Sequence, residues 1–178
     1  MRTVLLSIRP EWCKKILSGE KTVEIRKSCP AHGTPFKVYI YCTMTGSDKF
    51  FTDSLARNVD EWNLWKYPKR LGRVIGEFIC DDIRRIGPEY CVVKEDIESA
   101  IAGSCLTVPQ VKDYAGWKSG LSYADLKDLY GWHISDLKIY DQPRGLREFT
   151  RLQSTRFGMR PVEVQKPPQS WRYVEDSK

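Results

Sequence analysis

The sequence lacks the patterns that place a chain in a membrane or build a metal centre. No apolar run approaches the roughly 20 residues that a membrane-spanning helix needs. The apolar segment 4–8 is too short for a signal peptide. The six cysteines include no C-x-x-C pair and there are only two histidines, so we expect no metal, no redox motif and no cofactor. These absences predict a cytoplasmic protein that enters no membrane.

What the chain does have is a folded protein's composition and an uneven charge. Its 178 residues are 41% hydrophobic and 12% aromatic, which excludes a disordered chain and suits one domain. Residues 1–40 hold eight Lys and Arg against three acidic residues, residues 141–178 hold eight against five, and residues 91–140 hold five against seven. If both ends lie in one sheet, their cations form a surface that suits phosphates. The alternative is an ordinary solvated basic surface.

Apolar periodicity predicts a chain of strands and helices in mixed order. We expect helices over 10–18 and 95–102 and strands over 3–8, 22–27, 36–43, 73–86, 132–140 and 171–175. Residues 44–72 lose this periodicity. Residues 95–131 carry helix signals, with capping boxes at Thr107–Gln110 and Ser122–Asp125 and stops at Gly116 and Gly131. The pattern predicts an α+β protein with two insertions, at about 44–72 and 95–131.

Residues 19–26 carry a polar signature, G-x-K-x-x-E-x-R, where the first helix gives way to a strand. Gly19 fits the left-handed residue that ends a helix. Period two places Glu24 and Arg26 on one strand face and Lys21 on the other. One interpretation is a surface ion pair. The other is a ligand site, in which Lys21 and Arg26 bind a phosphate or a base while Glu24 accepts hydrogen bonds, orients Arg26 or relays a proton.

This signature resembles that of the ASCH family, which is related to the PUA fold. The match comprises Gly19, Lys21, Glu24 and Arg26, the strand 4–8 with Arg9-Pro10 after it, Trp-His-Ile at 132–134, and Pro-Pro-Gln-Ser-Trp at 167–171. The resemblance implies a single ASCH domain over residues 1–178, built as a PUA-like mixed β-barrel with flanking helices and the two insertions. It also implies RNA or a modified nucleotide as the partner, and identifies no obligate protein partner.

The resemblance places a basic cleft around the signature. Its expected ligand-binding residues are Gly19, Lys21, Glu24, Arg26, Arg9 and Trp171. Cations expected to contact a nucleic-acid backbone are Lys14, Lys27, Arg144, Arg147, Arg151 and Arg172. Trp171 is alternatively a core anchor, and the arginine run 144–160 a solvated face. We expect Lys21→Ala and Glu24→Gln to abolish binding or turnover and to leave the melting temperature within a few degrees.

Whether the protein is an enzyme stays open at this point. One ASCH branch consists of amidohydrolases that remove an acyl group from the exocyclic amine of cytidine, and ribonuclease activity is also associated with the family. If the protein is an enzyme, Lys21 and Glu24 are the expected catalytic residues. In an amidohydrolase Lys21 would activate the nucleophile or polarise the carbonyl while a separate carboxylate relays protons, and in a ribonuclease Glu24 would act with Lys21 or Arg26. The amidohydrolase branch has shorter chains and has threonine in place of Glu24. In this chain Glu77 could supply the carboxylate that such an enzyme needs. A second alternative is a protein-interaction adaptor that uses the excursion with Trp62 and Trp65 or the helical insertion.

Overall fold

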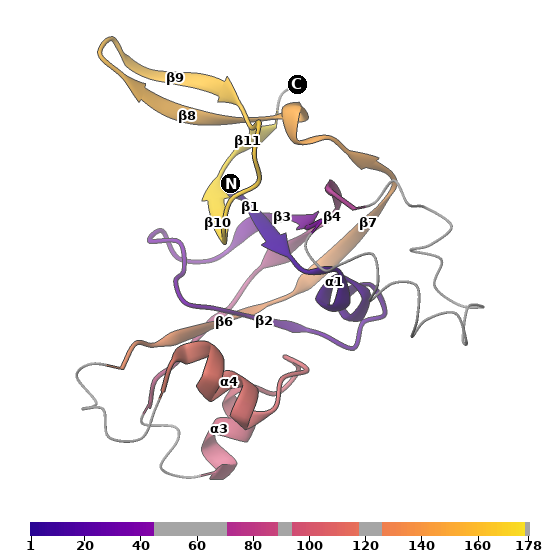
Figure 1. The fold of residues 1–178 in the computed structure, drawn as a ribbon, viewed down its shortest axis with the longest axis vertical. Helices are drawn as coiled ribbons and strands as arrows, with labels where there is room; N and C mark the ends of the chain where they lie inside the picture. The colour runs from indigo at the N-terminus through magenta and orange to yellow at the C-terminus, as the bar shows by residue number, and fades with distance from the viewer. Residues whose placement is uncertain (45–70, 89–93, 118–125, 177–178) are drawn as a thin grey trace. The chain divides into compact units, whose positions relative to one another are not determined.

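The computed structural model describes residues 1–44, 71–88, 94–117 and 126–176. Most of the predicted excursion at 44–72, with Trp62 and Trp65, and the Ser122–Asp125 capping box lie outside these residues. The described chain is α+β, with many strands and few helices (Figure 1). None of its helices has the length and apolarity to cross a membrane. Contacts divide the chain into two compact units, residues 1–17, 37–78 and 137–178 and residues 18–36 and 79–136.

The first unit is organised around a five-stranded sheet with the order β10-β1-β3-β4-β7. β1 lies parallel to β3 and antiparallel to β10. Leu5, Tyr39 and Phe149 are buried in its hydrophobic cluster. The elements wholly or mainly in this unit are β1 (Thr3–Ile8), α1 (Pro10–Leu17), β3 (Phe36–Cys42), β4 (Arg73–Cys80), β7 (Ser135–Arg144), the 3-10 helix η4 (Leu146–Glu148), β8 (Phe149–Thr155), β9 (Gly158–Glu163), β10 (Trp171–Tyr173) and β11 (Glu175–Asp176).

The second unit packs a small antiparallel sheet against two helices. Its elements are β2 (Val23–Arg26), β5 (Ile83–Ile86), α3 (Lys94–Ala100), α4 (Val108–Ala115) and β6 (Leu129–His133), with the strand order β2-β6-β5. Ile25 and Ile86 of the sheet share one buried cluster with Ile97 of α3 and Val111 of α4. The two helices therefore cover the face of the sheet that carries Ile25, and the opposite face carries Glu24 and Arg26.

The described strand pairings do not close into the predicted barrel. They form one five-stranded sheet and two three-stranded sheets, β11-β8-β9 and β2-β6-β5. In the five-stranded sheet β10 and β7 occupy opposite edges, so no described pairing joins the two ends into a ring. The assignment of one domain to residues 1–178, and of insertions at 44–72 and 95–131, stays a prediction.

Several element boundaries differ from those predicted. The strand expected over 73–86 is two strands, β4 and β5, which belong to different sheets and are separated at Asp81 and Asp82. The expected stop at Gly131 is wrong, because Gly131 lies within β6, where a Cβ would come 3.1 Å from Val23 Cγ1. The β8–β9 hairpin was not predicted, since it is polar, mostly exposed and contains Pro161. By contrast, the capping box of Thr107 and the left-handed stop at Gly116 are confirmed.

Candidate functional site

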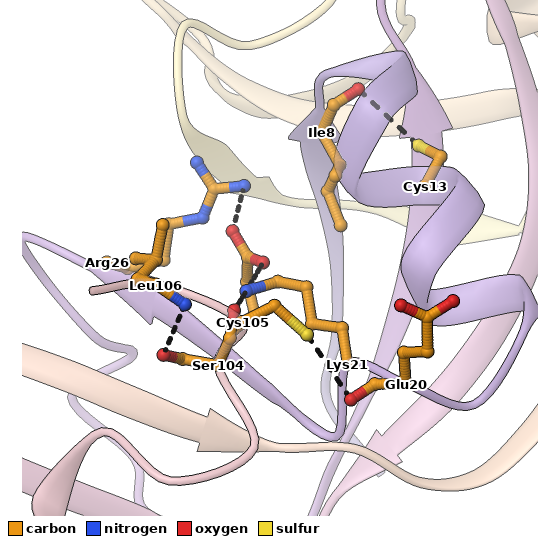
Figure 2. A network of polar contacts seen from close by, with 9 residues as sticks. Ile8, Cys13, Glu20, Lys21, Arg26, Ser104, Cys105 and Leu106 are labelled. Atoms are coloured by element: carbon orange, nitrogen blue, oxygen red, sulfur yellow. Dashed lines mark hydrogen bonds and ion pairs between the residues drawn. The ribbon is translucent and has the colours of Figure 1, made fainter. Parts of the chain in front are cut away.

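The signature segment is held by the loop that follows α3. The carbonyl of Gly103 accepts hydrogen bonds from the backbone N–H groups of Thr22 (2.9 Å) and Val23 (3.1 Å). Cys105 Sγ donates to the carbonyl of Glu20 at 3.3 Å (Figure 2). Gly103 has a φ of 78°, and a Cβ there would lie 2.3 Å from Thr22 Oγ1, so only glycine fits this contact. The loop thereby fixes the backbone just before β2.

Lys21, Glu24 and Arg26 converge into a charged triad. Lys21 Nζ donates to the carbonyl of Ser104 at 2.6 Å and lies 3.2 Å from Glu24 Oε2. Arg26 Nη2 lies 2.9 Å from Glu24 Oε1. Figure 2 shows the end of the Lys21 side chain beside the loop of Ser104, with a dashed line marking the ion pair of the Arg26 guanidinium. The placement of Lys21 on the opposite face is corrected, because β2 begins only at Val23 and the alternation does not reach back to Lys21.

The triad is buried, which differs from both interpretations of the signature. Lys21 is 3% exposed and Glu24 is 5% exposed, while the side chain of Arg26 is 12% exposed. Glu24 and Arg26 therefore do not form a surface ion pair, and Lys21 and Glu24 have almost no contact with solvent. Burial of ions is costly unless they are paired, so the three groups depend on one another. Of the three, Arg26 has the most contact with solvent.

The charges of the triad do not balance. The three side chains comprise two cations and one carboxylate. Glu24 Oε2 lies within ion-pair distance of Lys21 but accepts no hydrogen bond from the described residues. The most accessible member of the triad is Arg26.

Arg26 begins a row of three side chains that crosses the sheet of the second unit. Arg26 in β2 lies opposite Tyr130 in β6, and Tyr130 lies opposite Arg85 in β5. Directly opposed residues of antiparallel strands project from the same face, so the order across the sheet is cation, aromatic ring, cation. We call these residues the cationic row. Arg26 and Tyr130 are half-buried and Arg85 is exposed.

The cationic row runs into a cavity of about 640 Å³. Its lining residues are Lys27, Arg85, Pro88, Leu126, Lys127, Asp128 and Tyr130. Arg85 is held by Asp128 through two hydrogen bonds, Nε to Oδ2 at 2.6 Å and Nη2 to Oδ1 at 2.9 Å. Lys27 lies with its Nζ 4.9 Å from the centre of the Tyr114 ring. The lining includes three cations and one carboxylate, so the cavity has a net positive charge. The ring of Tyr130 adds an aromatic wall.

Sequence reasoning missed Tyr130 and Arg85. Residues 95–131 were read as a helical insertion, so the alternation that places Tyr130 on a strand face was not used. Arg85 was included in one long predicted strand, where its partner strand cannot be identified. The signal that was available is the alternation of polar Arg85 with buried Ile86 and of Tyr130 with buried Leu129.

The remaining predicted ligand and backbone residues belong to the first unit, apart from Gly19 and Lys27 in the second. Gly19 has the predicted left-handed φ, 76°. Arg9 is exposed and lies 4.0 Å from Glu11. Trp171 is half-buried, with its ring centre 5.5 Å from that of Tyr173. The structure brings Lys21, Glu24 and Arg26 together. It places Arg9 between β1 and α1, and Trp171 on β10, both in the other unit.

The predicted backbone cations have varied surroundings. Lys14 and Arg172 are half-buried, and Lys27 and Arg147 are exposed. Arg144 lies over the Phe149 ring at 4.4 Å, and its Nε donates to Glu148 at 3.1 Å, so it is partly engaged in packing. Arg151 lies on β8 and donates to Gln153 at 3.0 Å.

Other titratable groups have local partners or are shielded. Glu77 accepts a hydrogen bond from the Tyr140 hydroxyl and lies 3.2 Å from Lys37 Nζ. Burial, followed by the Glu77 carboxylate, raises the pKa of Tyr140. Burial raises the pKa of the Cys80 thiol to about 12, which makes it a poor nucleophile. Among the described residues no three His, Cys, Asp or Glu side chains are grouped to hold a metal ion.

Comparison with known proteins identifies the fold. No protein-family model and no curated protein matches the sequence. Solved structures of the ASCH protein of Zymomonas mobilis do match. A tyrosine-to-phenylalanine mutant has a TM-score of 0.52 at 19% identity, over 99% of this chain and 93% of that chain. The ASCH protein itself has a TM-score of 0.50 at 20% identity, over 97% and 87%. A serine-to-alanine mutant has a TM-score of 0.51 at 18% identity, over 98% and 89%. The chain therefore has the fold of the ASCH proteins, as its sequence signature predicted.

Proposed function

We propose that the protein binds RNA or a nucleotide at the cationic row of Arg26, Tyr130 and Arg85. The observation that carries this proposal is the register of the sheet, which sets one aromatic ring between two guanidinium groups on one face. A base stacks on an aromatic side chain for roughly 1 to 3 kcal/mol whatever its sequence. Guanidinium groups grip phosphate oxygens with two hydrogen bonds. The cavity beside the row adds Lys27 and Lys127 as further phosphate partners.

In this proposal Lys21 and Glu24 act through Arg26. Both side chains are buried, so they do not touch the ligand directly. Glu24 holds the Arg26 guanidinium at 2.9 Å and sets its direction. Lys21 contacts the other oxygen of the same carboxylate, so Glu24 is held from both sides. This corresponds to the orienting role that was one of the options for Glu24.

The burial of the triad favours binding over catalysis. An amidohydrolase or a ribonuclease that used Lys21 and Glu24 would need both groups to contact the reacting atoms. The binding function needs only the accessible part of Arg26 and its neighbours in the row. The similarity of fold to an ASCH protein supports the proposal at the level of architecture, and the basic composition of the chain is consistent with an anionic partner.

Neighbouring arginines on β5 provide a matched test. Arg85 belongs to the cationic row, whereas Arg84 projects from the opposite face and donates to the carbonyl of Ser99 at 3.1 Å. We expect Arg85→Gln to weaken binding of a labelled single-stranded RNA and to reduce the slope of log affinity against log salt by about 0.7, the value for one phosphate contact. Tyr130→Leu should weaken binding about tenfold at unchanged slope. Arg84→Gln should bind within about twofold of the wild type.

Fluorescence anisotropy at several salt concentrations measures these effects. Parallel titrations with single-stranded DNA and with a mononucleotide identify the preferred ligand. If Arg84→Gln and Arg85→Gln weaken RNA binding equally, the loss reflects the net charge of the protein and not the position of Arg85 in the row. If the wild type binds RNA and the Tyr130→Leu variant binds it with the same affinity, the proposed role of the cationic row is wrong.

A further inference from the structure

The β8–β9 hairpin is a two-stranded ribbon that extends well beyond its attachment to the rest of the first unit. Among the described residues β8 pairs with β11 at Phe149 and Thr150, whereas its pairing with β9 continues to Thr155 and Gly158. Figure 1 shows the two strands continuing past β11 as a separate ribbon. The turn is closed by the Thr155 hydroxyl, which donates to the carbonyl of Gly158 at 2.8 Å. Both faces of the extended part of the hairpin are therefore accessible to a binding partner.

The register gives the ribbon two chemically different faces. Arg151, Gln153 and Arg160 project from one face, since Arg151 lies opposite Val162 and Gln153 lies opposite Arg160. Arg151 Nη2 donates to Gln153 Oε1 at 3.0 Å, so these side chains are adjacent. We call this the basic face. The opposite face carries the exposed apolar side chains Leu152 and Met159.

The tip of the ribbon presents an aromatic ring to solvent. Phe157 is 78% exposed, which is unusual for so large an apolar side chain. The Arg156 guanidinium lies over its ring, 4.6 Å from the centre. A guanidinium beside an exposed ring is the pairing that single-strand-binding proteins offer to a nucleotide, with a phosphate on one group and a base on the other. The basic face therefore provides arginines for phosphates, and the tip provides an arginine and a ring for a phosphate and a base.

We infer that the β8–β9 hairpin is a second contact for single-stranded RNA, with phosphates on Arg151 and Arg160 and an unpaired base on Phe157. From residue 149 to 163 the hairpin carries three arginines and one acidic residue, Glu163, at the end away from the turn, so its net positive charge is complementary to a polyanion. The inference takes its ligand class from the proposed function, but the hairpin belongs to the first unit and the cationic row to the second. It also assigns to the hairpin only part of the arginine run, since Arg144 packs on Phe149.

A membrane surface fits the hairpin less well than RNA. An interfacial ribbon needs a continuous apolar face that enters the acyl region. Here the apolar face carries Pro161 beside Leu152 and Met159, but it also carries the polar residues Thr150, Ser154 and Glu163. Because half of its residues are polar and one of them is charged, the face is not continuously apolar. An anionic vesicle is accordingly the competing partner that the experiment includes.

The two faces of the hairpin supply their own control. In the full chain, Arg151→Gln with Arg160→Gln removes the charge of the basic face, and Leu152→Ser with Met159→Ser removes the apolar face. The probe is a single-stranded oligoribonucleotide of uniform sequence titrated at several salt concentrations. The basic-face variant should bind more weakly and lose about 1.4 from the salt slope, because two phosphate contacts disappear. Phe157→Ala should weaken binding about tenfold at the same slope. The apolar-face variant should stay within about twofold of the wild type.

Two further probes separate the possible failures. A mononucleotide should respond to Tyr130→Leu and be unaffected by the hairpin variants. If Tyr130→Leu weakens RNA binding and no hairpin variant does, the hairpin inference fails alone. If the wild type binds no RNA, the proposed function fails together with it. Losses confined to Leu152→Ser with Met159→Ser, with binding to vesicles of phosphatidylserine and phosphatidylcholine, would overturn RNA as the occupant in favour of a membrane.

Discussion

Replacement of Glu24 by glutamine is the most informative perturbation of the buried triad. The variant keeps the shape of the side chain and removes its negative charge. Lys21 and Arg26 then face each other without the carboxylate that lies 3.2 Å from one and 2.9 Å from the other. An exposed cleft would make the change nearly neutral for stability, as the sequence predicted. The burial of Lys21 and Glu24 reverses that expectation.

The magnitude follows from what each variant leaves behind. Breaking a buried ion pair by removing one partner costs about 3 to 5 kcal/mol, since the remaining charge is uncompensated. Glu24→Gln leaves two cations, so we expect a loss in this range, which is about 10 °C in melting temperature for a chain of this size. Lys21→Met leaves Glu24 still paired with Arg26 and deprives the Ser104 carbonyl of its donor, which costs about 1 to 3 kcal/mol.

The double variant tests the reasoning. Lys21→Met with Glu24→Gln removes one cation together with the carboxylate, so its loss should be smaller than the sum of the single losses by at least about 1 kcal/mol. Urea unfolding at neutral pH, followed by far-UV circular dichroism, gives all three free energies. Additive losses, or a Glu24→Gln variant as stable as the wild type, would refute the view that the triad is a coupled and buried unit.

Three other changes test local features. Gly76→Ala should lower the free energy of unfolding by about 1 to 3 kcal/mol, because a Cβ would lie 2.5 Å from the Lys138 carbonyl oxygen, and urea unfolding measures the loss. Thr107→Ala removes the capping box of α4 and should cost about 1 kcal/mol, seen as faster amide exchange in residues 108–115. The hydrogen bond with His133 lowers the pKa of Asp81, so the carboxylate stabilises the fold above about pH 4 and loses this effect as the pH falls through its lowered pKa. Asp81→Asn should therefore lose less stability than the wild type between neutral pH and pH 2, and equal acid sensitivity in urea titrations would contradict this.

The sequence by itself determined the elements whose signals are local. The strand predicted over 3–8 is β1 with the same bounds, because an apolar run closed by Arg9-Pro10 has no competing interpretation. The cap of α4 at Thr107 and the left-handed Gly19 are likewise fixed by residues within a few positions. The signature at 19–26 identified three charged groups that do meet, and it indicated the ASCH fold.

Only the tertiary structure decided how those charged groups are used. Lys21 is buried because its ammonium reaches the carbonyl of Ser104, 83 residues away in the chain, and no local pattern encodes that contact. The cationic row exists because Tyr130 pairs in register with both Arg26 and Arg85. A shift of one residue in either pairing would move Tyr130 to the other face relative to its partners. Register depends on the packing of whole strands against their neighbours, which is why residue spacing alone predicted a charged site but not the surface that it presents.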